Sequence, residues 1–333
     1  MRFATSVLLT LAAGTLSNAL PAPQAEEPTP TTVAETSTLP TAASSDPEVA
    51  SDQLDQLAQF AQQQANSTLE DNASKRGSCN IYNVAIRREW GSLSKADRKA
   101  YTDAVICLQA KTAKTPSSII PGAKSRFDDW VGTHINQTMT IHYTGTFLGW
   151  HRYFVWQYEQ ALRNECGYKG YQPYWDWAKT ASSGLEKSPI FDGSDSSMSG
   201  NGEATPNQGN IILGGNGLPE IPIPAGSGGG CVKSGPFKNM KVNLGPVALG
   251  LPGGATSANG DGLSYNPRCL KRDLTNYTNK KWANATSITS LILDNKDIES
   301  FQMVMQGVPG SGQIGVHGGG KFLLNRSTIK SQC

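Results

Sequence analysis

Three of the chain's four histidines lie close together in the sequence, and this cluster constrains the fold more than any other feature. They are His134, His142 and His151, whereas His317 stands alone among glycines near the end of the chain. Neutral imidazole nitrogens are ligands that copper and zinc favour. The pattern therefore predicts a metal site, although three unrelated histidines would give the same spacing.

The spacing of two of these histidines requires a break in the chain. His142 and His151 are nine positions apart, which on one continuous helix is about 2.5 turns and puts them on opposite faces. They can share a metal only if the helix is interrupted, and Gly145 and Gly149 offer places for the break. We expect His142 in a loop or at a helix end, and His151 at the start of the next helix.

Four segments have the pattern of amphipathic helices, which predicts a mainly α fold. In the first, Ser94 is the expected N-cap and Asp97 takes the capping-box position. The third is the clearest and ends just before Gly167. Residues 178–270 are rich in Gly, Ser, Pro and Asn, which predicts long loops with few regular strands. The helical segments are residues 94–109, 125–135, 150–166 and 294–306.

The first residues have the pattern of a secretory signal peptide, residues 1–19. Arg2 gives a positive start, a short apolar run follows, and small residues form a cleavage site ending at Ala19. A buried N-terminal helix is the alternative. Because no apolar run reaches the ~20 residues that a membrane span needs, we expect a secreted protein without a membrane partner.

Residues 20–76 have low complexity and predict a propeptide or linker. They are rich in Pro, Thr, Ser, Ala, Gln and Glu, and so bury too little apolar surface to fold alone. Residues 48–69 could form a weak amphipathic helix within this segment. The pair Lys75-Arg76 favours a processing site, with two solvated charges in a linker as the alternative. The folded domain is then predicted to span residues 77–333.

Cysteines and glycosylation sequons fit an oxidising compartment. Six cysteines predict disulfides, but the sequence leaves their pairing open. The cysteines are Cys79, Cys107, Cys166, Cys231, Cys269 and Cys333, and the sequons begin at Asn66, Asn72, Asn136, Asn276, Asn284 and Asn325. The formal net charge of +2 and the absence of a Walker or Rossmann glycine pattern argue against nucleic acid as a partner.

Short motifs surround and follow the histidine cluster. In chain order they include Thr133-His134-Ile135, Gly149-Trp150-His151-Arg152, Pro173-Tyr174-Trp175-Asp176-Trp177, Asn266-Pro267-Arg268-Cys269 and Gly315-Val316-His317-Gly318. Across about residues 79–322 these motifs closely resemble the tyrosinases and catechol oxidases, and in particular their short secreted fungal members.

The resemblance implies a fold, a cofactor and an activity. Members of this family have a four-helix-bundle core around two coppers, each held by three histidines, and carry long loops tied by disulfides. They use dioxygen to oxidise small phenols or o-diphenols to o-quinones, as polyphenol oxidases. The resemblance implies that His134, His142 and His151 hold the first copper, and that His317 is the first ligand of the second.

The resemblance also suggests roles for other residues. Glu159 and Asp176 are candidates to orient the imidazoles, since carboxylates often do so around a metal. The alternatives are a salt bridge with Arg163 or Arg152, or a helix-capping carboxylate. Four aromatic residues are expected in the core and not at the substrate: Trp150, Phe154, Trp175 and Trp177.

The second copper site departs from the family pattern. Where the family has a second histidine four residues after His317, this chain has Lys321, and no further histidine follows. A protonated lysine is a poor metal ligand. We expect a C-terminally incomplete domain that lacks the last bundle helix, from a gene-model error or a real shortening. The predicted oxidase is then impaired, and the alternatives are a non-catalytic secreted protein that binds a single copper or an inactive truncated product.

Overall fold

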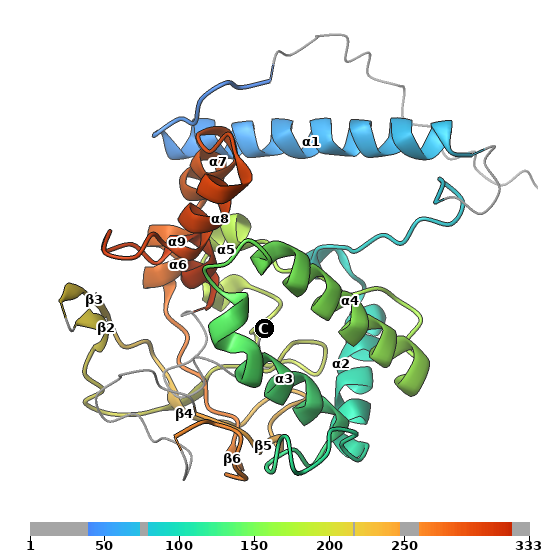
Figure 1. The fold of residues 1–333 in the computed structure, drawn as a ribbon, viewed down its shortest axis with the longest axis vertical. Coiled ribbons are helices and arrows are strands. Elements are labelled where there is room, and N and C mark those ends of the chain that lie inside the picture. The colour runs from blue at the N-terminus through green and yellow to red at the C-terminus, as the bar shows by residue number, and fades with distance from the viewer. Residues whose placement is uncertain (1–38, 74–78, 216, 247–259, 322–333) are drawn as a thin grey trace, which may run out of the picture. The chain divides into compact units, whose positions relative to one another are not determined.

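The computed structural model describes residues 39–73, 79–215, 217–246 and 260–321, and these residues form mainly helices joined by long connections (Figure 1). The predicted signal peptide, the pair Lys75-Arg76 and Cys333 lie outside the described residues. The helices are α1 (Pro47–Asp71), α2 (Lys95–Ala110), α3 (Arg126–Ile141), α4 (Phe147–Cys166), α5 (Trp177–Ser183), α6 (Asn276–Trp282), α7 (Ala285–Leu293), α8 (Ile298–Gln306) and α9 (Gly315–Lys321), with short 3-10 turns at Trp90–Ser92 and Leu185–Lys187.

Strands are short and pair only in twos within the described residues. The three antiparallel pairs are β1 (Gly202–Ala204) with β4 (Gly229–Val232), β2 (Ile211–Gly215) with β3 (Leu218–Ile223), and β5 (Lys241–Val242) with β6 (Arg268–Cys269). All six lie in the region predicted to be loop-rich, which confirms the expectation of few strands. No helix in the described ranges is long and apolar enough to cross a membrane.

Most helix predictions are confirmed, with shifted ends. Ser94 caps α2 as expected, and Gly167 ends α4 in the left-handed conformation with φ 70°. The second predicted helix continues to Ile141, and α4 begins already at Phe147. The fourth is shorter than predicted, because Asp297 caps α8 and starts it there.

Helix α1 forms in the low-complexity segment, where a weak helix was expected. Asp46 caps its N-terminus through the backbone N–H groups of Glu48 and Val49. Ala50 is fully buried, and its carbonyl accepts a hydrogen bond from Thr289 Oγ1 of α7 at 3.2 Å. Figure 1 shows α1 beside α7. The N-terminal part of α1 thus packs against α7, and this contact buries surface that the low-complexity segment could not bury by itself.

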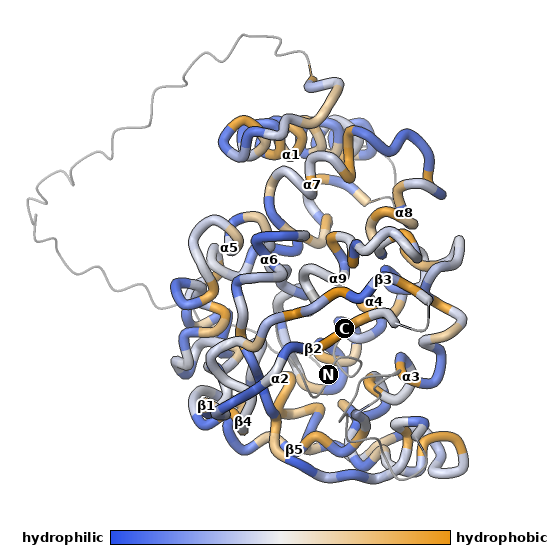
Figure 2. The backbone as a smooth tube through the Cα atoms, turned by 90° about the vertical axis from the view of Figure 1, so that its left-hand side faces the viewer, coloured by the Kyte–Doolittle hydropathy of each residue, from blue (hydrophilic) through white to orange (hydrophobic). Residues whose placement is uncertain are grey.

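The main hydrophobic core lies between α2, α4 and the loops that follow them. Leu108 of α2 and Leu162 of α4 are fully buried in it, and Trp90, Tyr101 and Tyr168 pack edge to face around them. Coloured by hydropathy, the chain changes repeatedly between hydrophilic and hydrophobic stretches (Figure 2). Helices α2, α3 and α4 contact one another in pairs, so this core fixes the helices that carry the histidine cluster.

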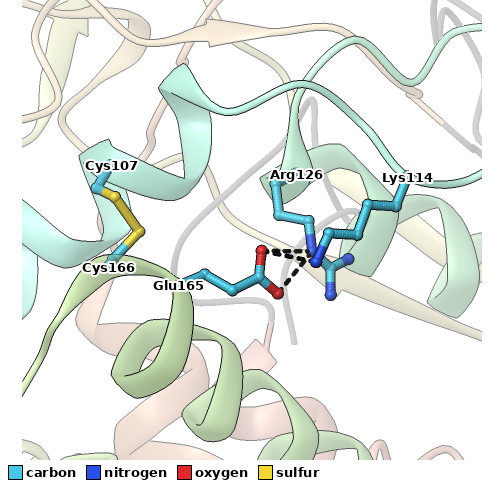
Figure 3. Close-up of a disulfide and its surroundings, with 5 residues drawn as sticks. All are labelled: Cys107, Lys114, Arg126, Glu165 and Cys166. Atoms are coloured by element: carbon cyan, nitrogen blue, oxygen red, sulfur yellow. Dashed lines mark hydrogen bonds and ion pairs between the residues drawn. A yellow bond between two sulfur atoms is a disulfide. The ribbon is translucent and has the colours of Figure 1, made fainter.

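Two disulfides form among the described residues, as predicted, one between two helices and one within the loop-rich region. Cys107 at the end of α2 is bonded to Cys166 at the end of α4 (Figure 3), and Cys231 of β4 is bonded to Cys269 of β6. Cys79 is exposed and forms no disulfide in the described part of the chain.

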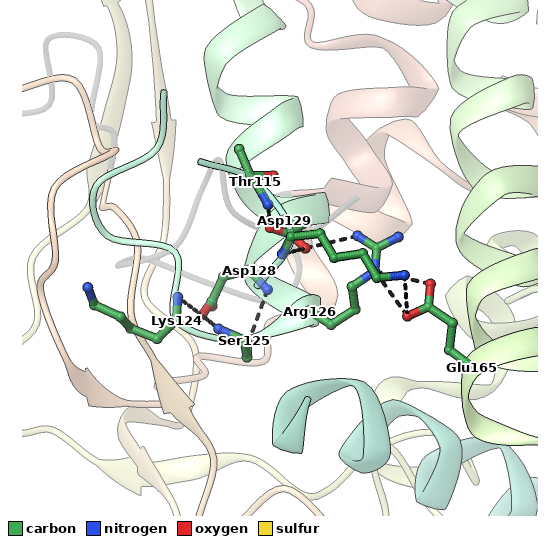
Figure 4. A network of polar contacts seen from close by, with 8 residues as sticks. Thr115, Lys124, Ser125, Arg126, Asp128, Asp129 and Glu165 are labelled. Carbon is green, nitrogen blue, oxygen red and sulfur yellow. Dashed lines mark hydrogen bonds and ion pairs between the residues drawn. The ribbon is translucent and has the colours of Figure 1, made fainter. Parts of the chain in front are cut away.

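A polar network fixes the start of α3 against the end of α4. Ser125 and Asp128 form a complete capping box, and Arg126 donates to Asp129 Oδ2 at 2.9 Å and to Glu165 Oε1 of α4 at 3.1 Å (Figures 3 and 4). Asp129 also accepts the backbone N–H groups of Lys114 and Thr115. Burial acts to raise the pKa of Asp129, but these hydrogen bonds outweigh it, and its pKa lies below the ordinary value.

Replacing Asp129 by Asn tests this network. Because the folded-state pKa of Asp129 is lowered, its carboxylate contributes stability above about pH 4, and this contribution is lost as the pH falls through the folded-state pKa. Asp129→Asn should lower the free energy of unfolding by about 1–3 kcal/mol near neutral pH, since an amide NH2 replaces one carboxylate oxygen and the donors to that oxygen lose their acceptor. The variant should also lose less stability than the wild type when the pH is lowered.

Urea unfolding at about pH 7 and about pH 3 measures both effects. Asp103→Asn is the matched control, because Asp103 forms an exposed pair with Lys99 within α2 and should change little. If Asp129→Asn loses as much free energy of unfolding between about pH 7 and about pH 3 as the wild type does, the account is contradicted.

Candidate metal centre

Helices α3 and α4 bring the three clustered histidines together. His134 is buried within α3, His142 is the C-cap of α3, and His151 lies in the second turn of α4. Each offers a ring nitrogen, and these atoms all lie within 4.8 Å of one another. The ring centroids of the three pairs are 5.1–5.4 Å apart. We call this group the histidine triad.

The break that lets the triad form falls directly after His142. Tyr143 has φ 55°, a left-handed conformation that costs a non-glycine residue about 1–2 kcal/mol. Gln306 of α8 holds it there: the Tyr143 backbone N–H donates to Gln306 Oε1 at 2.8 Å, and the Tyr143 hydroxyl donates to the Gln306 carbonyl at 3.1 Å. Gly149, one of the two predicted break points, lies inside α4.

Main-chain carbonyls orient two of the imidazoles. His142 Nδ1 lies 2.9 Å from the carbonyl oxygen of Thr138, and His151 Nδ1 lies 2.7 Å from that of Phe147. A carbonyl oxygen only accepts, so in both rings Nδ1 carries the proton and donates it. The lone pair of a neutral ring is then on Nε2, the atom that remains for a metal.

The geometry of the Nε2 atoms fits a shared metal ion. His134 Nε2 and His151 Nε2 lie 3.3 Å apart. Two nitrogens at this separation can both lie about 2 Å from one ion, which is the usual distance for imidazole ligands. A set of three neutral imidazoles is suited to copper or zinc. The donor set in this structure therefore fits copper.

Phe147 packs against the histidines and closes one side of the triad. Its side chain is 2 % exposed, and its ring centroid lies 4.8 Å from that of His151 and 5.8 Å from that of His142. The same ring lies 5.3 Å from His317. An apolar ring at this position excludes water from the triad and limits the tilt of the imidazoles.

His317 lies near the triad but outside it. It is carried by α9, and its ring centroid is 5.7 Å from that of His142. Lys321 ends the same helix four positions later. The structure thus places the fourth predicted metal residue beside the triad, and no further histidine exists in the sequence to accompany it.

Neither candidate carboxylate orients an imidazole. The helix-capping alternative is confirmed for Asp176, and Glu159 forms a salt bridge, but with Arg87 and not with Arg163 or Arg152. Glu159 pairs with Arg87 Nε at 3.0 Å and accepts the backbone N–H of Gln172 at 2.6 Å. Asp176 caps α5 by accepting the backbone N–H of Lys179. Both carboxylates therefore stabilise local structure. The sequence did not reveal three residues that position the imidazoles: Phe147, Thr138 and Gln306. Thr138 and Phe147 act through their main-chain carbonyls, which every residue type has.

Two of the four aromatic residues expected in the core pack against the triad. The rings of Trp150 and Phe154 stack at 4.7 Å and pack against His134 at 5.8 and 6.1 Å. Trp175 and Trp177 contact each other edge to face, 6.3 Å apart. None of the four lines the cleft that opens at His142 and His317, whereas Phe154 lines a second, smaller hollow at His134.

Two hollows adjoin the triad, and His134 lines both. The larger is a cleft of about 510 Å³ that reaches His142 and His317, a size suited to a small organic ligand. The smaller, of about 180 Å³, is lined by the buried Tyr101 and Arg272. Burial raises the pKa of Tyr101 to about 12 and lowers that of Arg272 to about 10, so both keep their protons at neutral pH.

The helical fold carries a histidine triad suited to a metal ion, and comparison with known proteins identifies the family. The common central domain of tyrosinase matches residues 124–331. Tyrosinase P of Aspergillus terreus is 42 % identical over 230 residues, which cover 67 % of this chain and 62 % of that protein. Tyrosinase-like protein orsC of Emericella nidulans is 41 % identical over 257 residues, which cover 73 % and 69 %.

A solved structure supports the same assignment. The polyphenol oxidase of Thermothelomyces thermophila aligns with a TM-score of 0.76 and 46 % identity, over 86 % of this chain and 74 % of that one. The chain belongs to the tyrosinase family, and its fold is tyrosinase-like, as the sequence motifs predicted. It spans less than two thirds of the length of Tyrosinase P.

Gln306→Ala tests the break between α3 and α4. Without the amide oxygen, Tyr143 loses the hydrogen bond that holds its left-handed conformation, and His142 loses its fixed position. Copper affinity should fall about 10–100-fold, as when outer partners of metal ligands are removed. Competition with a chromophoric chelator measures this. Gln62→Ala, at an exposed position of α1, is the control. Unchanged affinity in Gln306→Ala would show that the triad does not depend on this contact.

Proposed function

We propose that the protein is a copper-dependent oxidoreductase of the tyrosinase and catechol oxidase class, which converts phenols or o-diphenols to o-quinones. The observation that carries the proposal is the convergence of three imidazoles whose ring nitrogens lie within 4.8 Å of one another. Membership of the tyrosinase family supports the activity, and the described disulfides support a secreted protein.

The residues of this chain have separate tasks in that function. His134, His142 and His151 would hold the copper, which supplies redox chemistry toward dioxygen. Phe147 keeps water from the imidazoles, and Gln306 fixes the position of His142 through Tyr143. A phenol entering the larger cleft would meet the rings of His142 and His317 at its inner end.

We further propose that these 333 residues supply one complete copper site and that oxidation by this chain alone is impaired. A second three-histidine site would need six histidines in all, and the chain has four. The same count favours a second candidate function, a secreted protein that binds a single copper without catalysis.

Copper stoichiometry of two variants tests the proposed site. The 333-residue chain should bind about one copper per molecule, and His142→Ala should abolish binding because two imidazoles remain. His317→Ala is the matched control, since His317 lies outside the triad, and it should keep the stoichiometry of the parent. Equilibrium dialysis followed by metal analysis measures both.

Turnover of a catechol separates the two candidate functions. The chain as given should form little or no quinone from 4-methylcatechol with added copper. Two coppers per molecule together with copper-dependent quinone formation would contradict the single-site proposal and support an unimpaired oxidase. No copper binding in the parent chain would contradict both functions.

A further inference from the structure

The larger cleft carries no formal charge in its described walls. It reaches His142 and His317, and among the described residues that line it there is no Asp, Glu, Lys or Arg. This absence bears on the choice of substrate at a proposed oxidase site, because many natural phenols bear a carboxylate or an amine. The side chains that line the cleft therefore indicate which kind of substrate the proposed function would accept.

Apolar side chains form two facing walls of this cleft. On one side, Leu213 of β2 pairs with Ile221 of β3, and Leu218 lies at the tip of the same hairpin. On the other side, Met139 and Tyr143 come from the end of α3 and the break after it. The hairpin is anchored by the cluster of Ile223, Trp282 and Ile314, so its wall has a fixed position.

The rim of the cleft exposes large apolar side chains to solvent. Met139 is 76 % exposed, Tyr143 and Leu218 are each 52 % exposed, and Val308 is 42 % exposed. All four also line the cleft. Exposed apolar groups that gather around one concave opening are typical of a ligand-binding site.

Most polar side chains in these walls are already engaged within the protein. Thr138 Oγ1 donates to the His134 carbonyl, and the Gln306 amide accepts from Tyr143 and donates to Gln302. The Gln313 amide oxygen accepts the Trp282 indole N–H at 2.7 Å. They are therefore poorly placed to compensate a charged substituent that loses its water in the cleft.

We infer that this site selects uncharged phenols or catechols with an apolar ring substituent, and that phenolic acids and amines are disfavoured. An ion that leaves water without a counter-charge or hydrogen bonds loses more free energy than an apolar group of similar size. An apolar substituent instead buries surface against Leu213, Leu218 and Ile221. The inference rests on the proposed function, because it assumes that phenols reach the metal through this cleft.

Matched ligands test the selectivity in the metal-free chain, where no ligand is oxidised and no bound cation adds a counter-charge. One pair is 3-(4-hydroxyphenyl)propionate and its methyl ester, and the other is tyramine and N-acetyltyramine. The neutral member of each pair should bind about tenfold or more tightly, measured by titration calorimetry or by competition in saturation-transfer NMR. Equal affinities within both pairs would overturn the inference, and so would binding of none of the four ligands.

Charge placed on the hairpin tip tests the location. Leu218→Lys should strengthen binding of the propionate at least several-fold and leave or weaken binding of tyramine, whereas Leu218→Glu should do the reverse. Leu218 is half exposed, so both variants should fold. Ile298→Lys, at an exposed position of α8 outside the cleft, is the control and should change neither affinity. Ligand preferences that do not respond to either Leu218 variant would place binding elsewhere and overturn the inference.

These ligand measurements are independent of copper. Charge selectivity together with absent copper binding would count against the proposed function and not against the cleft. Copper binding to the triad, together with ligand affinities that do not depend on charge, would count against the inference on the cleft and not against the proposed function.

Discussion

The site depends on one interruption of the backbone, between α3 and α4. A continuous helix would put His142 and His151 on opposite faces, and the left-handed Tyr143 turns the chain so that both rings meet His134. Gln306, far away in the sequence, supplies the hydrogen bonds that offset the cost of this conformation. The metal centre is therefore a product of tertiary contacts between α8 and the break.

The rest of the structure keeps α3 and α4 in a fixed relation. At one end, the disulfide between Cys107 and Cys166 and the bond from Arg126 to Glu165 tie α2, α3 and α4 together. At the other end, Phe147 packs against the rings themselves. Between these points the two helices can change their relative position little, so the imidazoles are held near the arrangement that a metal requires.

The sequence predicted the class of fold and the members of the triad, but not the partners that orient them. Histidines are rare here, and helix caps such as Ser94 and Gly167 are local signals, so both could be read directly. The carbonyl of Thr138 and the amide of Gln306 carry no such signal, because any residue has a carbonyl and a buried glutamine acts only through its neighbours. The predicted loss of a last bundle helix concerns sequence beyond the described residues and stays a prediction.

The central claim is that His142 and His151 present Nε2 to a shared ion because carbonyls hold their Nδ1 protons. Long-range ¹H–¹⁵N NMR of the histidine side chains in the metal-free chain tests it most directly. The account predicts that Nδ1 carries the proton in the neutral form of both rings, and that zinc or copper(I) shifts the Nε2 signals of His134, His142 and His151 together. Protonation at Nε2 in His142 or His151, or a metal-induced shift that leaves out one of the three, would contradict it.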